Sequence, residues 1–363
     1  MQLLYEEDWE DTKQRYLAWW AQEAFGRCAL AVTAPKANPP ALPEPKRPAT
    51  PEERWTDLDY LSALCEYQLS RTFFGGEALP IWSGGYPGDK TLAVFLGCEV
   101  TLGWDTGWRE PILIGEDLSD VFSLRLDENG PHFQLALELL RRGVAEARGK
   151  SLVTVGAFGG VGDTLAALRG TERLLVDLIE RPDQVAGAEL FLMDLWCEVY
   201  DRFYETVKDV DEGSTCWFSL WSPGKFYAAQ NDFAYMISPE MFVEIFVPAL
   251  ERQTEFLDHS VYHVDGVGNF NHVDAICDLP DLQALQILPG AGKPSPLHYM
   301  EVLKKVQARG KNLHITIPAS EVRTALEHLS ARGLFIQTSC DSEEEARELL
   351  RKAETWSRDS KVG

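Results

Sequence analysis

The most informative stretch of this 363-residue chain is Val261-Tyr-His-Val-Asp-Gly-Val-Gly-Asn-Phe-Asn-His-Val-Asp274. Its apolar beginning predicts a short β-strand that ends in His263 and Asp265. These residues are two positions apart, so a strand places both side chains on the same face. Gly266 and Gly268 then break the strand. Polar side chains at the carboxyl end of a strand, with glycines opening the loop, are typical of barrel active sites. A buried pair that only holds a loop is the alternative.

From residue 134 onward, apolar runs alternate with amphipathic segments. Short continuous apolar runs predict strands buried on both faces, as in a parallel sheet. These strands are 152–157, 215–220, 261–264, 282–288, 312–317 and 334–338, and 28–34 and 78–82 precede them. Six strands after residue 150, with one or two before it, favour an α/β fold of the (β/α)8 TIM-barrel type over an open doubly wound sheet. We expect one domain over residues 1–363, with residues 1–75 as an N-terminal helical and loop extension packed on the barrel.

Composition limits the classes of partner. The chain has 34 basic and 57 acidic residues, which gives a net charge of −23. This excess of negative charge argues against nucleic acid and against an anionic membrane surface as partners. No apolar run approaches a membrane-spanning length, and the first residues lack the pattern of a signal peptide. The seven cysteines are scattered without a CxxC pair, as in reduced core positions. We therefore expect a cytoplasmic protein.

The residues that follow the strands of a barrel meet at one rim. After strand 152–157 comes a glycine-rich loop that ends in Asp163. Its N–H groups suit an anion, whereas Asp163 is equally well placed to cap a helix. The rest of the rim carries carboxylates, amides, an imidazole and a thiol, with few lysines or arginines. This favours a small polar or cationic ligand over a polyanion. The predicted substrate-binding residues are Asp163, Trp221, Gln230, Asn231, Asn269 and Gln286.

Two mechanisms are compatible with these groups. In the first, His263, Asp265 and Cys340 bind a metal ion, because an imidazole, an oxygen ligand and a thiolate suit Zn²⁺ with an open fourth position. In the second, His263 acts with Asp265, Asp232 or Asp163 as general acid and base without a metal. The candidate catalytic residues are therefore His263, Asp265 and Asp232. Outside this set, Arg169 is expected to be structural.

Three stretches of the chain resemble one superfamily. Residues 162–170, 237–242 and 262–266, together with the closing strand and helix, are similar to the uroporphyrinogen decarboxylase-like superfamily. That superfamily has the (β/α)8 fold and contains the decarboxylase and methyltransferases that serve corrinoid proteins. The chain lacks the decarboxylase's arginine-rich RQAGR motif, so it resembles the methyltransferase branch more closely. There, an H-x-C pair and a distant cysteine bind zinc. The matching positions are His263, Asp265 and Cys340, with Asp265 in place of cysteine.

The resemblance implies a methyltransferase-like enzyme that acts on a small polar substrate and exchanges methyl groups with a corrinoid protein. The corrinoid protein is expected to be separate, because no cobalamin-binding DxHxxG motif occurs in this sequence. The resemblance also implies a homodimer. The alternative function is a decarboxylase-like lyase, or a hydrolase, that uses carboxylate and histidine acid–base chemistry on a small polar metabolite. A non-catalytic binding protein is the third hypothesis.

Overall fold

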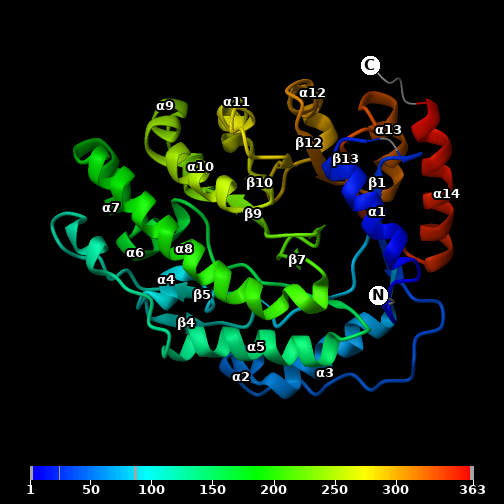
Figure 1. Cartoon of the computed structure of the whole chain (residues 1–363), viewed down its shortest axis with the longest axis horizontal. Coiled ribbons are helices and arrows are strands. Elements are labelled where there is room, and N and C mark those ends of the chain that lie inside the picture. Colours follow the sequence, from blue (N-terminus) through cyan, green and yellow to red (C-terminus); the bar gives the residue numbers. More distant parts are fainter. Residues whose placement is uncertain (1–2, 24, 86–87, 360–363) are drawn as a thin grey trace.

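The computed structural model describes residues 3–23, 25–85 and 88–359, and the remaining residues lie outside this description. It shows an α/β fold with a mostly parallel sheet and helices packed around it (Figure 1). The strands are β1 (Ala29–Pro35), β2 (Thr72–Gly76), β3 (Ile81–Trp82), β4 (Val100–Leu102), β5 (Gly107–Arg109), β6 (Leu152–Val153), β7 (Ser214–Thr215), β8 (Trp221–Ser222), β9 (Phe226–Gln230), β10 (His259–Asp265), β11 (Ala284–Leu288), β12 (Asn312–Thr316) and β13 (Leu334–Ser339).

The α-helices cover the outside of these strands (Figure 1). They are α1 (Trp9–Trp20), α2 (Pro51–Thr56), α3 (Leu58–Arg71), α4 (Leu92–Phe95), α5 (Pro131–Ala147), α6 (Asp163–Arg169), α7 (Thr171–Glu180), α8 (Pro182–Asp211), α9 (Pro239–Met241), α10 (Val247–Phe256), α11 (Val273–Cys277), α12 (Met300–Ala308), α13 (Val322–His328) and α14 (Glu343–Asp359). Two 3₁₀ turns, η2 (Asp232–Met236) and η4 (Val267–His272), follow β9 and β10 directly. These turns carry or adjoin residues of the predicted site.

The central sheet has seven strands in the order β2-β1-β13-β12-β11-β10-β9. Every neighbouring pair is parallel except β1 and β2, which are antiparallel. A second parallel pair joins β3 to β6, and a bridge between Thr154 and Thr215 continues from β6 to β7. The predicted strands 261–264, 282–288, 312–317 and 334–338 are confirmed as β10 to β13. The predicted extension 1–75 contributes β1, which lies second from one edge of the sheet.

The strand pairing of the described residues does not close into a ring, which corrects the prediction of a closed (β/α)8 barrel. One reason is that β2 occupies the edge of β1 that would otherwise receive β3. Another is that the predicted strand 215–220 shortens to β7, because the chain then turns and Ser219 adopts a left-handed φ of 54°. The strand that pairs with β10 is instead β9, which the sequence pattern did not predict. The arrangement is barrel-like but open.

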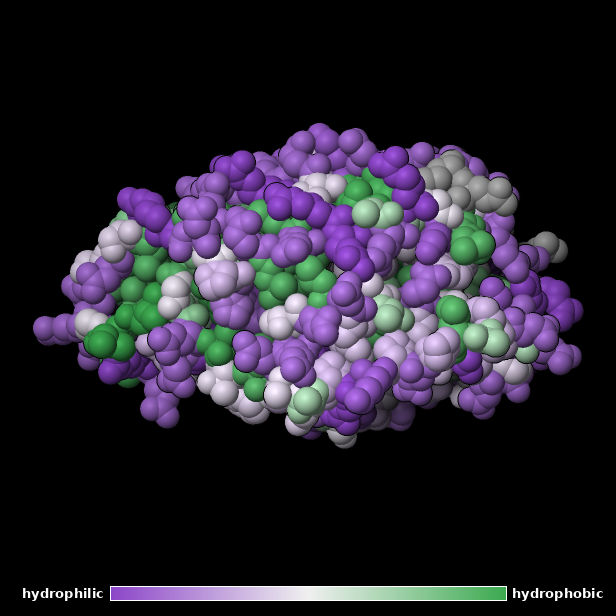
Figure 2. Space-filling model, turned by 90° about the horizontal axis from the view of Figure 1, so that it is seen from below, coloured by the Kyte–Doolittle hydropathy of each residue, from purple (hydrophilic) through white to green (hydrophobic). Residues whose placement is uncertain are grey.

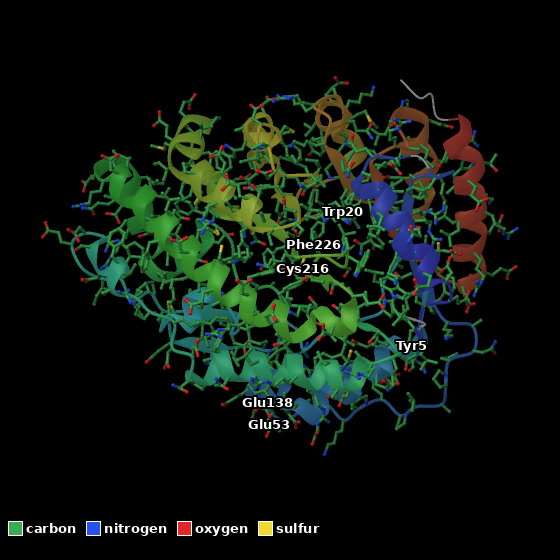
Figure 3. The ribbon with its side chains drawn as sticks, viewed as in Figure 1. Tyr5, Trp20, Glu53, Glu138, Cys216 and Phe226 are labelled. Atoms are coloured by element: carbon green, nitrogen blue, oxygen red, sulfur yellow. The ribbon has the colours of Figure 1, made fainter. Side chains whose placement is uncertain are left out.

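Helix α1 closes the amino end of the sheet with an aromatic face. The Nε1 group of Trp19 donates to the carbonyl of Gly333, just before β13, at 3.0 Å. Asn312, the first residue of β12, donates from Nδ2 to the carbonyl of Trp19 at 2.8 Å. Trp20 packs edge-on against Phe226 with ring centroids 5.5 Å apart (Figure 3). Such pairs add about 0.5–1.5 kcal/mol beyond burial. We call the opposite, carboxyl end of the sheet the mouth.

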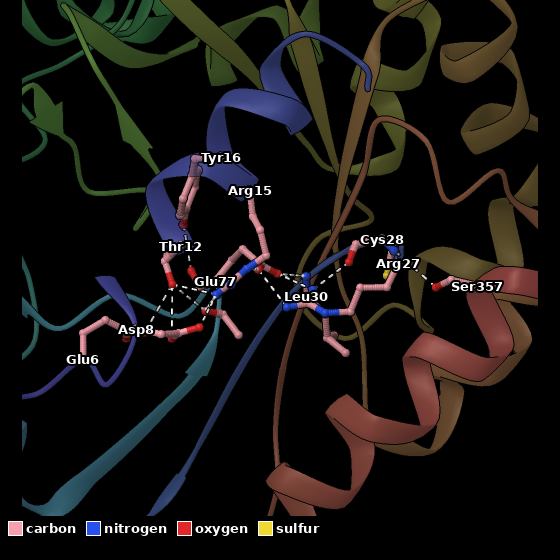
Figure 4. A network of polar contacts seen from close by, with 11 residues as sticks. Glu6, Asp8, Thr12, Arg15, Tyr16, Arg27, Cys28, Leu30, Glu77 and Ser357 are labelled. Carbon is pink, nitrogen blue, oxygen red and sulfur yellow. Dashed lines mark hydrogen bonds and ion pairs between the residues drawn. The ribbon is translucent and has the colours of Figure 1, made fainter. Parts of the chain in front are cut away.

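A buried carboxylate fixes α1 against the edge of the sheet. Glu77 is fully buried and accepts hydrogen bonds from Arg15, from Arg27 at 2.5 and 2.8 Å, and from the Leu30 N–H at 2.5 Å (Figure 4). Two guanidinium groups and a backbone donor compensate the buried charge, which would otherwise be very costly. This network lies at the amino end of β1, so it belongs to the scaffold.

The surface is mostly hydrophilic, as expected from a chain in which 25% of the residues are charged. Figure 2 shows hydrophilic side chains over most of one face and apolar ones gathered at its left end. All seven cysteines are free and six are buried, which confirms the prediction of unpaired core positions. Among the described residues, no helix combines the length and apolar character needed to cross a bilayer.

Candidate functional site

The candidate site is built on a row of polar side chains that crosses the sheet. His263 on β10 pairs in register with Gln230 on β9 and with Gln286 on β11. Gln286 pairs in turn with His314 on β12. Residues paired in register lie side by side on one face of a sheet. We call these four residues the polar row, and it lies between the aromatic face of α1 and the mouth.

His263 is held as a neutral base within this row. Its Nδ1 forms a short hydrogen bond with Oε1 of Gln286. An amide oxygen only accepts, so Nδ1 carries the proton and Nε2 keeps a free lone pair. Trp217 and Phe218 pack edge-on against the imidazole, with centroids 5.1 and 5.9 Å away. Burial lowers the pKa of His263, and Gln286 and nearby carboxylates oppose that shift.

Two carboxylates approach the free side of His263. Asp265 lies two residues further along β10, with Oδ2 3.9 Å from Nε2 of His263. This distance is too long for a hydrogen bond. Asp232 begins η2, and one ligand atom from each of Asp232, His263 and Asp265 lies within 4.8 Å of the others. The Oδ1 atom of Asp265 is buried without a hydrogen-bond partner in the described structure. This spacing leaves room for a cation between the three side chains.

The local electrostatics favour a positive charge. Asp232 has an exposed side chain, yet it lies in a hollow where neighbouring protein displaces water. That desolvation, followed by the charges of Asp163 and Asp265, raises the pKa of Asp232 to about 7. Burial also raises the pKa of Asp163. Clustered carboxylates of this kind destabilise each other's charge, and a bound cation relieves the repulsion.

Asp163 connects α6 to β9. It accepts hydrogen bonds from the Gln230 amide at 3.1 Å and from the Phe233 N–H at 2.9 Å. It does not cap α6, because the capping position is Gly162 and no side chain caps this helix. A Cβ atom on Gly162 would lie 2.3 Å from Oδ1 of Asn231, so only glycine permits this close approach. The glycine loop therefore positions Asp163 against the end of β9.

The glycine loop offers little to an anion. The N–H of Gly162 donates to Glu189 on α8 at 2.9 Å and is therefore occupied. A cavity of about 720 Å³ opens beside the loop. Its walls include Asp163, Gln230 and Asp232 together with the exposed Trp108. This volume suits a small molecule.

Two of the predicted substrate-binding amides support loops instead of lining this cavity. Asn231 is buried, and its Oδ1 accepts from the N–H of Ala234 at 3.2 Å, which caps η2. Asn269 is buried too, and its Nδ2 donates to the carbonyl of Asp265 at 2.6 Å. Each amide therefore fixes the backbone beside a carboxylate of the site.

The structure places two further predicted residues away from the group. Trp221 is 2% exposed and packs edge-on against Trp9 of α1, because the chain turns back into β8 at the amino end. Cys340 follows β13, which β11 and β12 separate from β10. Its N–H donates to the carbonyl of Thr33 at 2.9 Å. Among the described residues, Asp232 takes the place beside His263 and Asp265 that Cys340 was predicted to fill.

Sequence reasoning missed one member of the polar row, His314, and two aromatic side chains beside the row, Trp217 and Phe218. His314 is fully buried between Phe218 and Phe335, with centroids 4.8 and 5.2 Å away, and burial lowers its pKa to about 3. Trp217 has a buried Nε1 without a partner in the described structure. A histidine in the middle of an apolar strand is the signal that would have found His314, because such positions are rarely polar. Trp217 and Phe218 carried no such signal within a run that resembles a strand.

The chain matches no protein-family model and no curated protein sequence. Among solved structures, its fold is similar to that of a methyltransferase from Methanosarcina mazei, with a TM-score of 0.61 and 13% sequence identity. The similarity covers 95% of this chain and 98% of that one. At this identity the likeness establishes the fold alone.

Proposed function

We propose that this protein is a methyltransferase-like enzyme with an open, barrel-like α/β fold that acts on a small polar substrate. The observation that carries the proposal is the grouping of Asp232, Asp265 and a neutral His263 at the mouth. The similarity to the Methanosarcina mazei methyltransferase supports the transferase class. The resemblance to the uroporphyrinogen decarboxylase-like superfamily supports methyl exchange with a separate corrinoid protein.

The three side chains fit a divalent metal, and we propose Zn²⁺. One imidazole nitrogen and two carboxylate oxygens form a ligand set that zinc accepts, with a position left for substrate. The Nδ1–H of His263 binds Gln286, and metal-binding histidines commonly have such an acceptor. The unpaired Oδ1 of Asp265 is a further atom that a ligand would satisfy. When bound, the metal would supply a Lewis acid that lowers the pKa of a substrate thiol or hydroxyl group.

The surrounding side chains orient this site and keep water from its inner side. Gln286 fixes the imidazole plane of His263, and the rings of Trp217 and Phe218 cover its edges. On the outer side, Asp163 holds the amide of Gln230 at the cavity wall. The substrate would therefore enter from the cavity side and meet the free Nε2 and the carboxylates first.

A second candidate function is a lyase or hydrolase that uses the same residues without a metal. The observation in its favour is the pKa of Asp232, which its surroundings raise to about 7. A carboxyl group that holds a proton near neutral pH suits general acid catalysis. The neutral His263, 3.9 Å from Asp265, would then serve as the base.

Elemental analysis of the purified, unchelated protein tests the two candidates. We expect about one zinc ion per chain, lost in Asp232→Asn and His263→Gln and retained in Cys340→Ala. Asp274→Asn is the matched control, because Asp274 pairs with Lys305 and Arg309 at the surface. Zinc loss in Cys340→Ala would restore the ligand set predicted from sequence. A zinc-free wild-type protein would favour the second candidate.

Methyl transfer is tested with free methylcobalamin and a small thiol as probes. Demethylation changes the absorbance of the corrinoid, so the reaction is followed directly. We expect turnover by the wild-type protein and by Asp274→Asn, and none by Asp232→Asn or His263→Gln. Equal rates in all four proteins would refute the assignment of these residues to methyl transfer.

A further inference from the structure

The mouth contains a second hollow that the carboxylate group does not use. This cavity of about 530 Å³ is lined by the strand ends of β1, β12 and β13 and by the loop after β12. The lining residues are Thr33, Thr316, Ile317, Pro318, Ala319, Gln337, Thr338 and Ser339. None of them carries a charge. Hydroxyl and amide groups supply its polar side chains.

The strand register places most of these polar groups on the same face as the polar row. Thr316 lies two residues after His314, so both point to one side of β12. Thr316 pairs in register with Gln337 on β13, and Thr33 on β1 pairs with Ser339. Gln337 and Ser339 are themselves two residues apart. The mouth is therefore lined by carboxylates from the β9–β10 side and by neutral polar groups from the β12–β13–β1 side.

Exposure shows that this part of the mouth is hollow. Thr316 and Ser339 are exposed, although each lies in a strand that has a parallel neighbour on both sides. Side chains in such strands are normally covered. Thr338 lies between Gln337 and Ser339 on β13, so its buried side chain points to the opposite face of the strand and leaves the hollow to its two neighbours.

We infer that this hollow, which we call the neutral subsite, binds the hydroxyl-rich part of an uncharged polyol or sugar-like ligand. Hydroxyl groups of Thr33, Thr316 and Ser339 both donate and accept, and the amide of Gln337 also has both a donor and an acceptor. These groups match adjacent ligand hydroxyls, which also donate and accept. The lining has no cation for a carboxylate or phosphate and no anion for an ammonium group. Ile317 and Pro318 supply apolar surface for the C–H face of such a ligand.

The inference names a substrate class for the proposed enzyme and rests on the proposed function for the reaction. Binding itself does not depend on that function, because the neutral subsite shares no lining residue with the group formed by Asp232, His263 and Asp265. Binding and catalysis are therefore separable by experiment.

The test uses myo-inositol as an uncharged probe, with citrate and choline as anionic and cationic probes of similar size. Saturation-transfer NMR on the full-length protein is expected to show binding of myo-inositol in preference to both charged probes. The double variant Thr316→Val/Ser339→Ala is expected to weaken this binding about tenfold, since each removes one hydroxyl partner. Thr206→Val is the matched control, because the Thr206 hydroxyl binds a helix carbonyl on α8.

Two results would overturn the inference. The first is binding of citrate or choline in preference to myo-inositol, or no binding of myo-inositol. The second is unchanged affinity in the folded double variant, with Thr316→Ala as a second variant if the double one does not fold. Asp232→Asn is expected to bind myo-inositol like the wild type. Loss of zinc or activity in Asp232→Asn therefore reports on the proposed function alone.

Discussion

His314 should make the stability of this protein depend on pH in the acidic range. The imidazole is fully buried between two phenylalanine rings, and burial, together with repulsion from His263 once that ring is protonated at low pH, lowers the pKa of His314 from 6.5 to about 3. Below pH 6.5 the unfolded chain takes up a proton at this residue, whereas the folded protein does so only near pH 3. The stability contributed by neutral His314 is therefore present above pH 6.5 and is lost as the pH falls toward 3.

The size of this effect follows from the two pKa values. A difference of one bound proton changes the free energy of unfolding by about 1.4 kcal/mol per pH unit. Between about pH 7.5 and about pH 5, this residue alone should lower the free energy of unfolding by about 2 kcal/mol. His314→Leu keeps an apolar group between the rings and removes the titration. The change in packing shifts the free energy of unfolding by the same amount at every pH. Only the loss of the titrating imidazole changes how the free energy of unfolding depends on pH.

Urea denaturation followed by tryptophan fluorescence measures both quantities. We expect the wild type to lose about 2 kcal/mol more than His314→Leu between about pH 7.5 and about pH 5. His298→Leu serves as the control, because the side chain of His298 is exposed, and it should show the wild-type loss. Parallel stability curves for the wild type and His314→Leu would refute the argument that His314 is buried as a neutral base.

Three further substitutions test the scaffold of the site. Gln286→Leu leaves Nδ1–H of His263 without an acceptor, so chelator competition should show about 10–100-fold weaker zinc binding. An unchanged zinc affinity would contradict the argument that Gln286 orients the imidazole of His263. Burial raises the pKa of Glu189 from 4.5 to about 8. The stability that protonated Glu189 contributes is therefore present below pH 4.5 and is lost as the pH rises through 8. Urea denaturation of Glu189→Gln should not show this loss of stability. Arg169→Met breaks a buried ion pair and should lower the free energy of unfolding by about 3–5 kcal/mol, whereas Arg173→Met, at an exposed guanidinium, should change it little.

Local sequence patterns predicted most of the sheet but not its closure. The strands β10 to β13 are continuous apolar runs, and their burial on both faces follows from that pattern. The segment that forms β9 follows Pro223-Gly224 and has two alanines at its centre, which gives a weak strand signal. Closure depends on which strand pairs with the free edge of β1. That choice is a long-range contact, and nothing in residues 29–35 or 72–76 taken alone indicates that they pair with each other.

The candidate site was predictable only where spacing fixes geometry. His263 and Asp265 share a face because they are two residues apart in a strand, and the structure agrees. Asp232 was also predicted as a catalytic residue of the rim, but its place beside His263 depends on the register of β9 with β10, which no local pattern reveals. Cys340 was predicted as a ligand because it follows a predicted strand and also matches a family motif, but β11 and β12 lie between its strand and β10. Trp221 was predicted to bind substrate because it follows a predicted strand, but its side chain packs against Trp9 at the amino end. The position of an aromatic residue after a predicted strand therefore does not indicate at which end of the sheet its side chain lies.

The distribution of charge around the mouth follows from a physical constraint on the carboxylates. Desolvation, followed by the charges of Asp163 and Asp265, raises the pKa of Asp232, so this group of carboxylates needs either a cation or a proton to remain side by side. Further carboxylates on β12, β13 and β1 would increase that repulsion, and basic groups there would compete for the same carboxylates. Hydroxyl and amide groups do neither. In the proposed enzyme, a neutral half beside an acidic half would let the mouth bind an uncharged substrate while the carboxylates stay free for a cation or a proton.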